Sequence, residues 1–294
     1  MPIAKSKTWL LASRPKTLWA AVSPVLMGTA MAYADGFVHW PSAAAALFSA
    51  ILIQIGTNFA NDYFDYSKGA DTTERIGPTR ATQAGMVKPD AMRKAFIIAF
   101  GIAMLLGLYL VWRGGWIIVL IGSVSIFLGI IYTATPYALA YTGLADIFVL
   151  IFFGPVAVGG TYYVQALDIN AIVLIAGLSP GLISTAILTV NNLRDVNQDR
   201  AAGRKTLAVR FGVNFAKIEY LLLIAAACLM PLVLHYLTRA NFFAVFATLT
   251  FFLAIPAIRT VFSHKEAITL NTVLANTGKL LLIFSLAFSI GWII

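Results

Sequence analysis

Residues 42–65 read Ser42-Ala-Ala-Ala-Ala-Leu-Phe-Ser-Ala-Ile-Leu-Ile-Gln-Ile-Gly-Thr-Asn-Phe59 and then Ala60-Asn61-Asp62-Tyr63-Phe64-Asp65. The first part is an apolar run that is long enough to cross a bilayer as a helix. The second part places two carboxylates at the end of that run. Because a mid-membrane aspartate costs roughly 2.5 to 3.5 kcal/mol, it is normally held by a partner or used in function. The stretch therefore predicts a membrane helix that ends in a cluster needing a counter-ion.

The polar side chains of this stretch share one face of the expected helix. Asn58, Asp62 and Asp65 are spaced at i, i+4 and i+7, and Asn61 lies at i+3. Like charges on adjacent turns repel unless a cation lies between them, and hard oxygen ligands of this kind suit Mg²⁺. An isolated pair is more often a helix end whose carboxylates are solvated in the headgroup region, so the rest of the chain must decide.

The composition places the chain in a membrane. Of its 294 residues, 60% are hydrophobic and 11% are charged, whereas ordinary soluble domains carry about 25% charged residues. Nine apolar segments lie near residues 17–34, 42–60, 94–112, 115–133, 144–165, 170–190, 214–236, 241–260 and 273–293. We expect an all-α, multi-pass membrane protein whose nine transmembrane helices form one bundle and a single domain over residues 1–294.

The basic residues indicate the orientation of this bundle. All but two of the 21 Lys and Arg residues, Arg113 and Arg239, lie in the N-terminal tail or in connections on one side of the expected membrane. Positive residues concentrate on the cytoplasmic side, so we expect the N-terminus in the cytoplasm and the C-terminus outside. The net charge of +9 then reflects topology. We expect no nucleic-acid partner, and we expect a protein of the cytoplasmic (inner) membrane.

A second polar row follows the sixth apolar segment. It reads Asn191-Asn192-Leu-Arg-Asp195-Val-Asn-Gln-Asp199-Arg200, and then Ala-Ala-Gly-Arg204-Lys205. Asn192, Asp195 and Asp199 fall at i, i+3 and i+7 of a helix. One acidic helix end is common, but two on the same side, each followed by Arg and Lys, are not. Because carboxylates gather Mg²⁺ while Arg and Lys bind phosphate oxygens, the joint pattern predicts a diphosphate site.

A diphosphate site at a membrane surface suits one kind of chemistry. When the C–O bond of a diphosphate ester breaks, its negative charge must be neutralised, and metal ions supply that stabilisation. A long isoprenoid tail could stay in lipid while its head reaches the cytoplasmic side. An allylic cation would need a dry, aromatic wall, to which Tyr132 could contribute by cation–π attraction. Aromatic residues at helix ends are, however, more often interfacial anchors.

The two rows also resemble a known family. Asn61-Asp62-x-x-Asp65 and Asp195-x-x-x-Asp199 are similar to the two aspartate-rich motifs of the UbiA superfamily of intramembrane prenyltransferases. The likeness runs from Arg14-Pro-Lys-Thr17 through all nine segments. The longer forms, residues 58–85 and 191–212, resemble the 1,4-dihydroxy-2-naphthoate prenyltransferases. Gly69 stands where many other members have a third aspartate, which fits this branch.

The resemblance implies a reaction and a set of residues. The reaction transfers a polyprenyl group from polyprenyl diphosphate to 1,4-dihydroxy-2-naphthoate with loss of CO₂ and diphosphate, and gives demethylmenaquinol for menaquinone synthesis. By matching position, one Mg²⁺ would be bound by Asp62 and Asp65, and a second by Asp195 and Asp199. The supporting ligands and substrate contacts would be Asn58, Asn61, Arg75, Arg80, Tyr132, Asn191, Asn192, Arg200 and Lys205, with Asn58 and Asn191 nearest the metals.

Two other functions are compatible with part of this pattern. A prenyltransferase for another acceptor, such as 4-hydroxybenzoate, homogentisate, a porphyrin derivative or a glycerol phosphate, would share both acidic rows, and only the flanking segments discriminate. A cation-coupled transporter would place its acids near the membrane midplane, between inverted halves. The acids of this chain lie at the cytoplasmic ends of the expected helices, which favours a diphosphate delivered from the surface.

Overall fold

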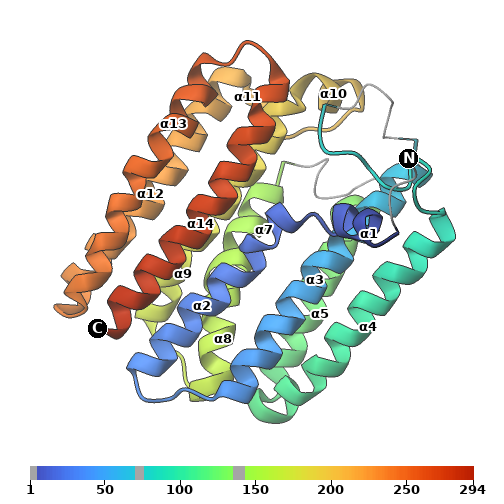
Figure 1. Ribbon diagram of the computed structural model, residues 1–294. Coiled ribbons are helices and arrows are strands. Elements are labelled where there is room, and N and C mark those ends of the chain that lie inside the picture. The colour runs from blue at the N-terminus through green and yellow to red at the C-terminus, as the bar shows by residue number, and fades with distance from the viewer. Residues whose placement is uncertain (1–4, 70–75, 135–142) are drawn as a thin grey trace.

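The computed structural model describes residues 5–69, 76–134 and 143–294, and every regular element in these ranges is a helix. The elements are α1 (Lys5–Ser13), η1 (Pro15–Thr17), α2 (Trp19–Ala34), α3 (Trp40–Ser67), α4 (Pro89–Gly114), α5 (Trp116–Ala134), α7 (Ala145–Ile151), η2 (Phe152–Val156), α8 (Ala157–Ala166), α9 (Ala171–Arg194), α10 (Val196–Ala201), α11 (Leu207–Phe211), α12 (Val213–Thr238), η3 (Phe242–Leu249), α13 (Thr250–Ser263), η4 (Ala267–Thr269) and α14 (Leu270–Ile293). The long helices lie side by side in one bundle, with α1, α10 and α11 at one end (Figure 1).

The helices match the apolar segments of the sequence. Within the described residues, seven helices are long and apolar enough to cross a membrane, and the bent pair Ser6–Thr17 and Trp19–Ala34 adds an eighth if it is one span. The remaining expected segment coincides with a shorter apolar helix, Trp116–Tyr132. The expected all-α membrane fold is therefore confirmed. The count of nine transmembrane helices and their orientation stay predictions.

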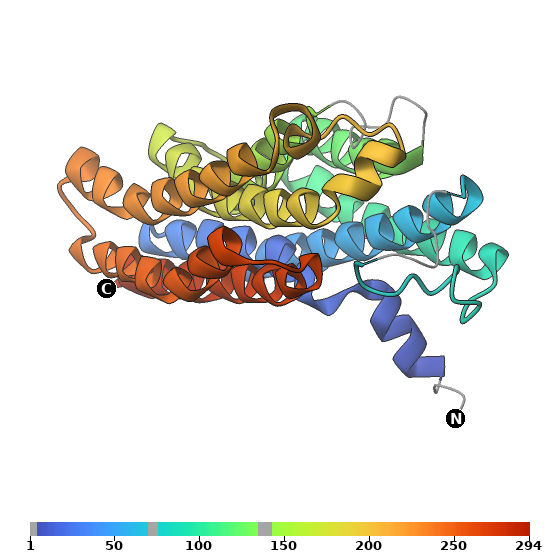
Figure 2. The same cartoon turned by 90° about the horizontal axis from the view of Figure 1, so that it is seen from above.

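A sharp bend separates α1 from α2. Pro15 lacks an N–H group and its ring disfavours a helical conformation at the residue before it. Arg14 accordingly adopts a left-handed conformation with φ of 52°, and the Thr17 hydroxyl donates to the Arg14 carbonyl at 2.9 Å. The two helices meet at 54°, so α1 leaves the bundle at an angle (Figure 2). The bend brings Arg14 and Thr17 to the end of the bundle where both acidic rows lie.

Helix α9 is the centre of the larger apolar core. It packs against α12, α14, α7 and η2, and its Ile183, Ala186 and Val190 are fully buried. Its contact with the α7–η2 segment is so close that a Cβ on Gly181 would lie 2.3 Å from the Leu150 carbonyl oxygen. Only glycine permits that approach. The second acidic row begins on this buried helix, which ends at Arg194. Asp195 has non-helical backbone angles and Asp199 lies on the short helix α10, so the single helix expected from the spacing of Asn192, Asp195 and Asp199 is broken at Asp195.

A second, smaller core supports the first acidic row. Phe59 and Ala60 on α3 pack with Met92, Phe96 and Phe100 on α4. Helix α3 continues past this cluster to Ser67, beyond the end of the expected apolar segment. The first row thus lies on helix, as its spacing requires, and its backbone is fixed by the aromatic packing beneath it.

Candidate active site

The first row lies on the last turns of α3. Asn58, Asn61, Asp62 and Asp65 are all buried, and the two aspartates are only 2% and 3% exposed. The Asn58 amide nitrogen donates to the Ser13 carbonyl at 2.9 Å and to the Thr17 hydroxyl at 3.2 Å. This residue therefore ties the bend between α1 and α2 to the first row.

Asp62 organises the loop between α3 and α4. Its two carboxylate oxygens accept hydrogen bonds from the backbone N–H of Ala81 at 2.9 Å and of Thr82 at 3.0 Å. The loop closes on itself where the Met86 N–H donates to the Ala81 carbonyl at 2.9 Å. Because the backbone is fixed on both sides, Arg80 enters the protein instead of extending into solvent.

Asp65 is held between two arginines. The buried Arg80 forms an ion pair with its Oδ2 atom, and Arg204, from the segment after α10, approaches its Oδ1 atom at 3.5 Å. Lys68, one turn further along, interacts with the same carboxylate, although partial burial lowers the pKa of this lysine. The carboxylate of Asp65 is thus compensated by cations from both connecting segments.

Asp195 is paired with its own neighbour. Arg194 donates to the two carboxylate oxygens of Asp195 from Nε at 2.7 Å and from Nη2 at 2.6 Å. The Arg194 side chain is fully buried and also donates to the side-chain oxygens of Asn191 and Asn271, both at 2.8 Å. Asn271 belongs to α14, and its amide nitrogen donates to the Ile76 carbonyl at 3.0 Å. Bidentate pairs of this kind are strong and geometrically specific.

Asp199 is held by Arg204. Burial raises the pKa of Asp199 to about 6, and the charge of Asp195 adds to this shift, while the guanidinium of Arg204 opposes it. Arg204 reaches the Asp199 Oδ1 atom from Nη1 at 3.3 Å. Because a buried carboxylate needs a nearby cation to stay ionised, Arg204 supports the charged form of Asp199. The same guanidinium contacts Asp65, so it joins the first row to the second.

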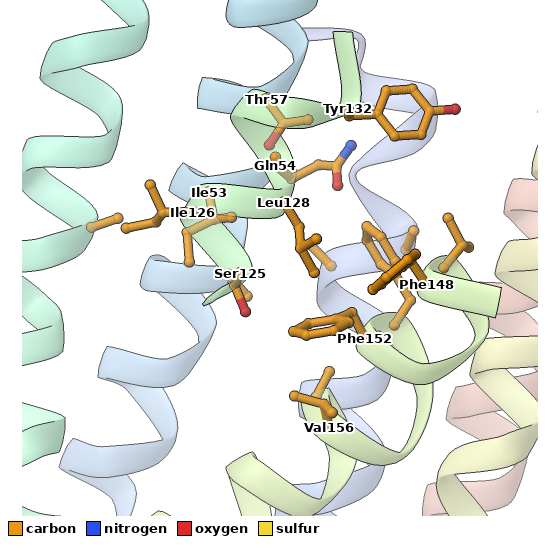
Figure 3. Close-up of a pocket in the computed structure, with 18 of the residues that line it drawn as sticks. Ile53, Gln54, Thr57, Ser125, Ile126, Leu128, Tyr132, Phe148, Phe152 and Val156 are labelled. Atoms are coloured by element: carbon orange, nitrogen blue, oxygen red, sulfur yellow. The ribbon is translucent and has the colours of Figure 1, made fainter. Parts of the chain in front are cut away.

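Both rows open onto one cavity of about 1120 Å³. Its polar end is formed by the two rows, and most of the remaining wall is apolar. In Figure 3, Gln54 and Thr57 of α3, Leu128 and Tyr132 of α5, and Phe148 and Phe152 of the α7–η2 segment surround this space. Cavities of 300–1,000 Å³ are usual for small ligands, so this one has room for a ring and for part of a long chain.

The structure brings most of the expected residues together. The cavity wall includes Asn58, Asn61, Asp65, Arg80, Tyr132, Asn191, Asn192, Asp195 and Asp199. Asp62 lies behind this wall, and Arg200 and Lys205 are exposed and do not line the cavity. Arg75 lies outside the described residues. The chemical roles assigned to all these side chains stay predictions.

Arg14, Gln54 and Arg204 line the cavity but were not expected there. The Arg14-Pro15 dipeptide does signal a helix break, which is how Arg14 reaches the site. Arg204 and Lys205 are adjacent cations that the sequence does not distinguish. The chain turns at Gly203, whose φ is 70°, and the Arg204 N–H donates to the Asp199 carbonyl at 2.8 Å. Because of that turn, the Arg204 side chain lines the cavity and the Lys205 side chain does not.

The donor set at the polar end fits Mg²⁺. Among the described residues, no three His, Cys, Asp or Glu side chains converge on one point. Mg²⁺ is usually held by one or two carboxylates together with substrate phosphates and water, not by a complete cage of side chains. Asp65 and Asp199, which share Arg204, and the asparagine side chains beside them supply oxygen donors of this type.

Comparisons with known proteins agree with this architecture. A 1,4-dihydroxy-2-naphthoate octaprenyltransferase of Escherichia coli (strain K12) is 36% identical, over 98% of this chain and 96% of the relative. The enzyme of the same name from Mycobacterium tuberculosis is 34% identical, over 97% and 96%. A UbiA homolog from Archaeoglobus fulgidus, solved with GPP and Mg²⁺, superposes with a TM-score of 0.67 at 14% identity over 98% of this chain and 100% of the homolog. The profile of the UbiA prenyltransferase family matches residues 21–292, and the chain therefore belongs to that family.

Proposed function

We propose that the protein transfers a polyprenyl group from polyprenyl diphosphate to 1,4-dihydroxy-2-naphthoate, with release of diphosphate and CO₂, and so makes demethylmenaquinol for menaquinone synthesis. One observation carries the proposal: two acidic rows far apart in the sequence form the polar end of a single large cavity whose other walls are mostly apolar. The names of the relatives, which match nearly the full chain, support the choice of acceptor.

The acidic rows would hold the metal. Asp65 and Asp199 face the cavity and are the strongest candidates for direct ligands. Asp62 and Asp195 already accept strong hydrogen bonds, and each would complete the ligand set of its own row, with Asn58 and Asn191 in support. We propose two Mg²⁺ ions, one for each row. When bound, they would neutralise the diphosphate as its C–O bond breaks.

Other cavity residues would bind the diphosphate and surround the prenyl chain. Arg80 and Arg14 lie beside the rows and would bind diphosphate oxygens. The aromatic side chains of Tyr132, Phe148 and Phe152 would line the path of the allylic carbon and keep water away from it. The electron-rich ring carbon that bears the carboxylate attacks the allylic carbon, and the diphosphate leaves with the electron pair of the C–O bond. The carboxylate then leaves as CO₂, and the electron pair of its C–C bond restores the aromatic ring.

The acceptor assignment is tested by offering two substrates in parallel. Purified protein with Mg²⁺ and a polyprenyl diphosphate is given either 1,4-dihydroxy-2-naphthoate or 4-hydroxybenzoate, and the prenylated product and CO₂ are measured. We expect both from the naphthoate and neither from the benzoate. Product from 4-hydroxybenzoate alone would show that the proposed acceptor is wrong. The absence of product from both acceptors would contradict the proposed prenyl transfer.

We also propose that nine helices cross the membrane as one domain, with the N-terminus and the active site at the cytoplasmic face and the C-terminus outside. The asymmetry of Lys and Arg supports this orientation. The Cys228→Ser substitution removes the single buried cysteine. In that background, two separate variants, Thr79→Cys and Asp168→Cys, each carry one thiol at an exposed position, and we expect these positions on opposite sides of the membrane. In intact cells, a membrane-impermeant maleimide should label position 168 and not position 79. The reverse pattern would invert the topology.

A further inference from the structure

Arg204 differs from the buried Arg80 and Arg194 because its guanidinium contacts an aspartate of each row. Its Nη2 atom lies 3.5 Å from Asp65 on α3, and its Nη1 atom lies 3.3 Å from Asp199 on α10. One guanidinium thus contacts two of the carboxylates that line the cavity, Asp65 and Asp199. A divalent cation bound by either carboxylate must compete with that positive charge.

The Arg204 side chain also borders the space that a ligand would enter. Its side chain is 20% exposed, it lines the cavity, and it follows a glycine turn at Gly203. Arg194 provides the contrast, since its side chain is fully buried and is held by Asn191, Asp195 and Asn271. Arg204 therefore differs from Arg194 in having a partly exposed side chain that borders the space a ligand would enter.

We propose that Arg204 is an internal counter-ion that exchanges partners during binding. Before the substrate arrives, it bridges Asp65 and Asp199 and holds the two rows together. When diphosphate enters with Mg²⁺, the guanidinium transfers from the carboxylates to the phosphate oxygens, which it can bind as a planar fork. Arg204 thereby opposes the binding of metal alone and favours the binding of metal with diphosphate. This inference rests on the proposed diphosphate substrate.

The exchange has a thermodynamic consequence. If diphosphate removes the cation that competes with Mg²⁺, each ligand must strengthen the binding of the other by the same factor. Metal would then enter mainly with the diphosphate it neutralises. The carboxylates would not collect metal in the absence of substrate, and the site would stay electrically balanced throughout.

The test measures binding without any prenyl transfer. Mn²⁺ binding, followed by paramagnetic resonance, is titrated on the full-length protein in detergent, with and without inorganic diphosphate. The proteins compared are the wild type, Arg204→Gln and Arg204→Lys. The matched control is Arg93→Gln, which removes an exposed cation on α4 whose contact with Asp90 is at 4.0 Å. Thermal unfolding of each variant confirms that it is folded.

We expect Arg204→Gln to bind Mn²⁺ alone about tenfold more tightly than the wild type, the size expected when one charge-assisted contact no longer competes. The strengthening by diphosphate should shrink by at least the same factor. Arg204→Lys, which keeps the charge without the fork, should fall between the two, and Arg93→Gln should match the wild type. If Arg204→Gln binds Mn²⁺ alone no better and keeps the full coupling, the inference is wrong. If the wild type binds no diphosphate under any condition, the proposed function fails instead.

Discussion

Replacing Asp65 with asparagine is expected to lower kcat/KM for prenyl transfer by about 10³-fold, the upper part of the range seen when one electrostatic contact to a developing charge is removed. Asparagine keeps the size of the side chain, so the cavity retains its shape. It removes the one carboxylate that faces the cavity from α3 and that both Arg80 and Arg204 contact. Steady-state rates with saturating Mg²⁺ and a polyprenyl diphosphate give the measurement.

The control for Asp65 is Asp90→Asn. Asp90 is an exposed carboxylate at the start of α4, so its loss changes the net charge equally but touches no part of the cavity. We expect this variant to keep wild-type kinetics. Full Mg²⁺-dependent turnover by Asp65→Asn would remove this residue from the proposed chemistry. A rate loss accompanied by loss of cooperative unfolding would indicate a structural role instead.

The second large effect concerns stability. Arg194→Met should destabilise the protein by on the order of 3–5 kcal/mol, because it leaves the Asp195 carboxylate buried without its cation. It also removes the hydrogen bonds to Asn191 and Asn271. Thermal unfolding in detergent, read by circular dichroism, should show a much lower transition temperature than the wild type.

A double variant separates charge from packing. In Arg194→Met/Asp195→Leu both charges of the pair are absent, and well-packed apolar replacements of buried ion pairs are often neutral or stabilising. We expect most of the lost thermal stability to return, while prenyl transfer is lost in the double variant because the second row lacks an acid. A single variant as stable as the wild type would show that the bidentate pair contributes little to holding this helix end.

Much of the fold could be read from the sequence because it depends on apolar segments and helical periodicity. The run that contains Gln54 predicts α3 by its length, and the i, i+4, i+7 spacing of Asn58, Asp62 and Asp65 correctly places them on one helical face. Two rows beside one cavity follow from the same reasoning, since both were expected at helix ends on one side of the membrane.

The partners of each acid could not be read in this way, because they depend on where the loops turn. Asp62 and Asp65 look alike in the sequence, yet Asp62 accepts backbone N–H groups and Asp65 pairs with arginines. The sequence does not distinguish Arg204 from Lys205. The turn at Gly203 places Arg204, and not Lys205, in the cavity wall. The contact between Arg194 and Asn271 carries no sequence signal, because the two residues lie far apart in the chain.

Asn271 on α14 is synthesised after both acidic rows, although it contacts segments connected to them. Its amide joins the Ile76 carbonyl to the Arg194 guanidinium, so α14 links the end of α9 to the segment between α3 and α4. A protein is made from its N-terminus, and its early parts fold first. Both acidic rows are therefore synthesised and inserted long before Asn271 exists. These two hydrogen bonds can form only after α14 has been synthesised, and a ribosome that stalls before α14 leaves Arg194 without its Asn271 partner.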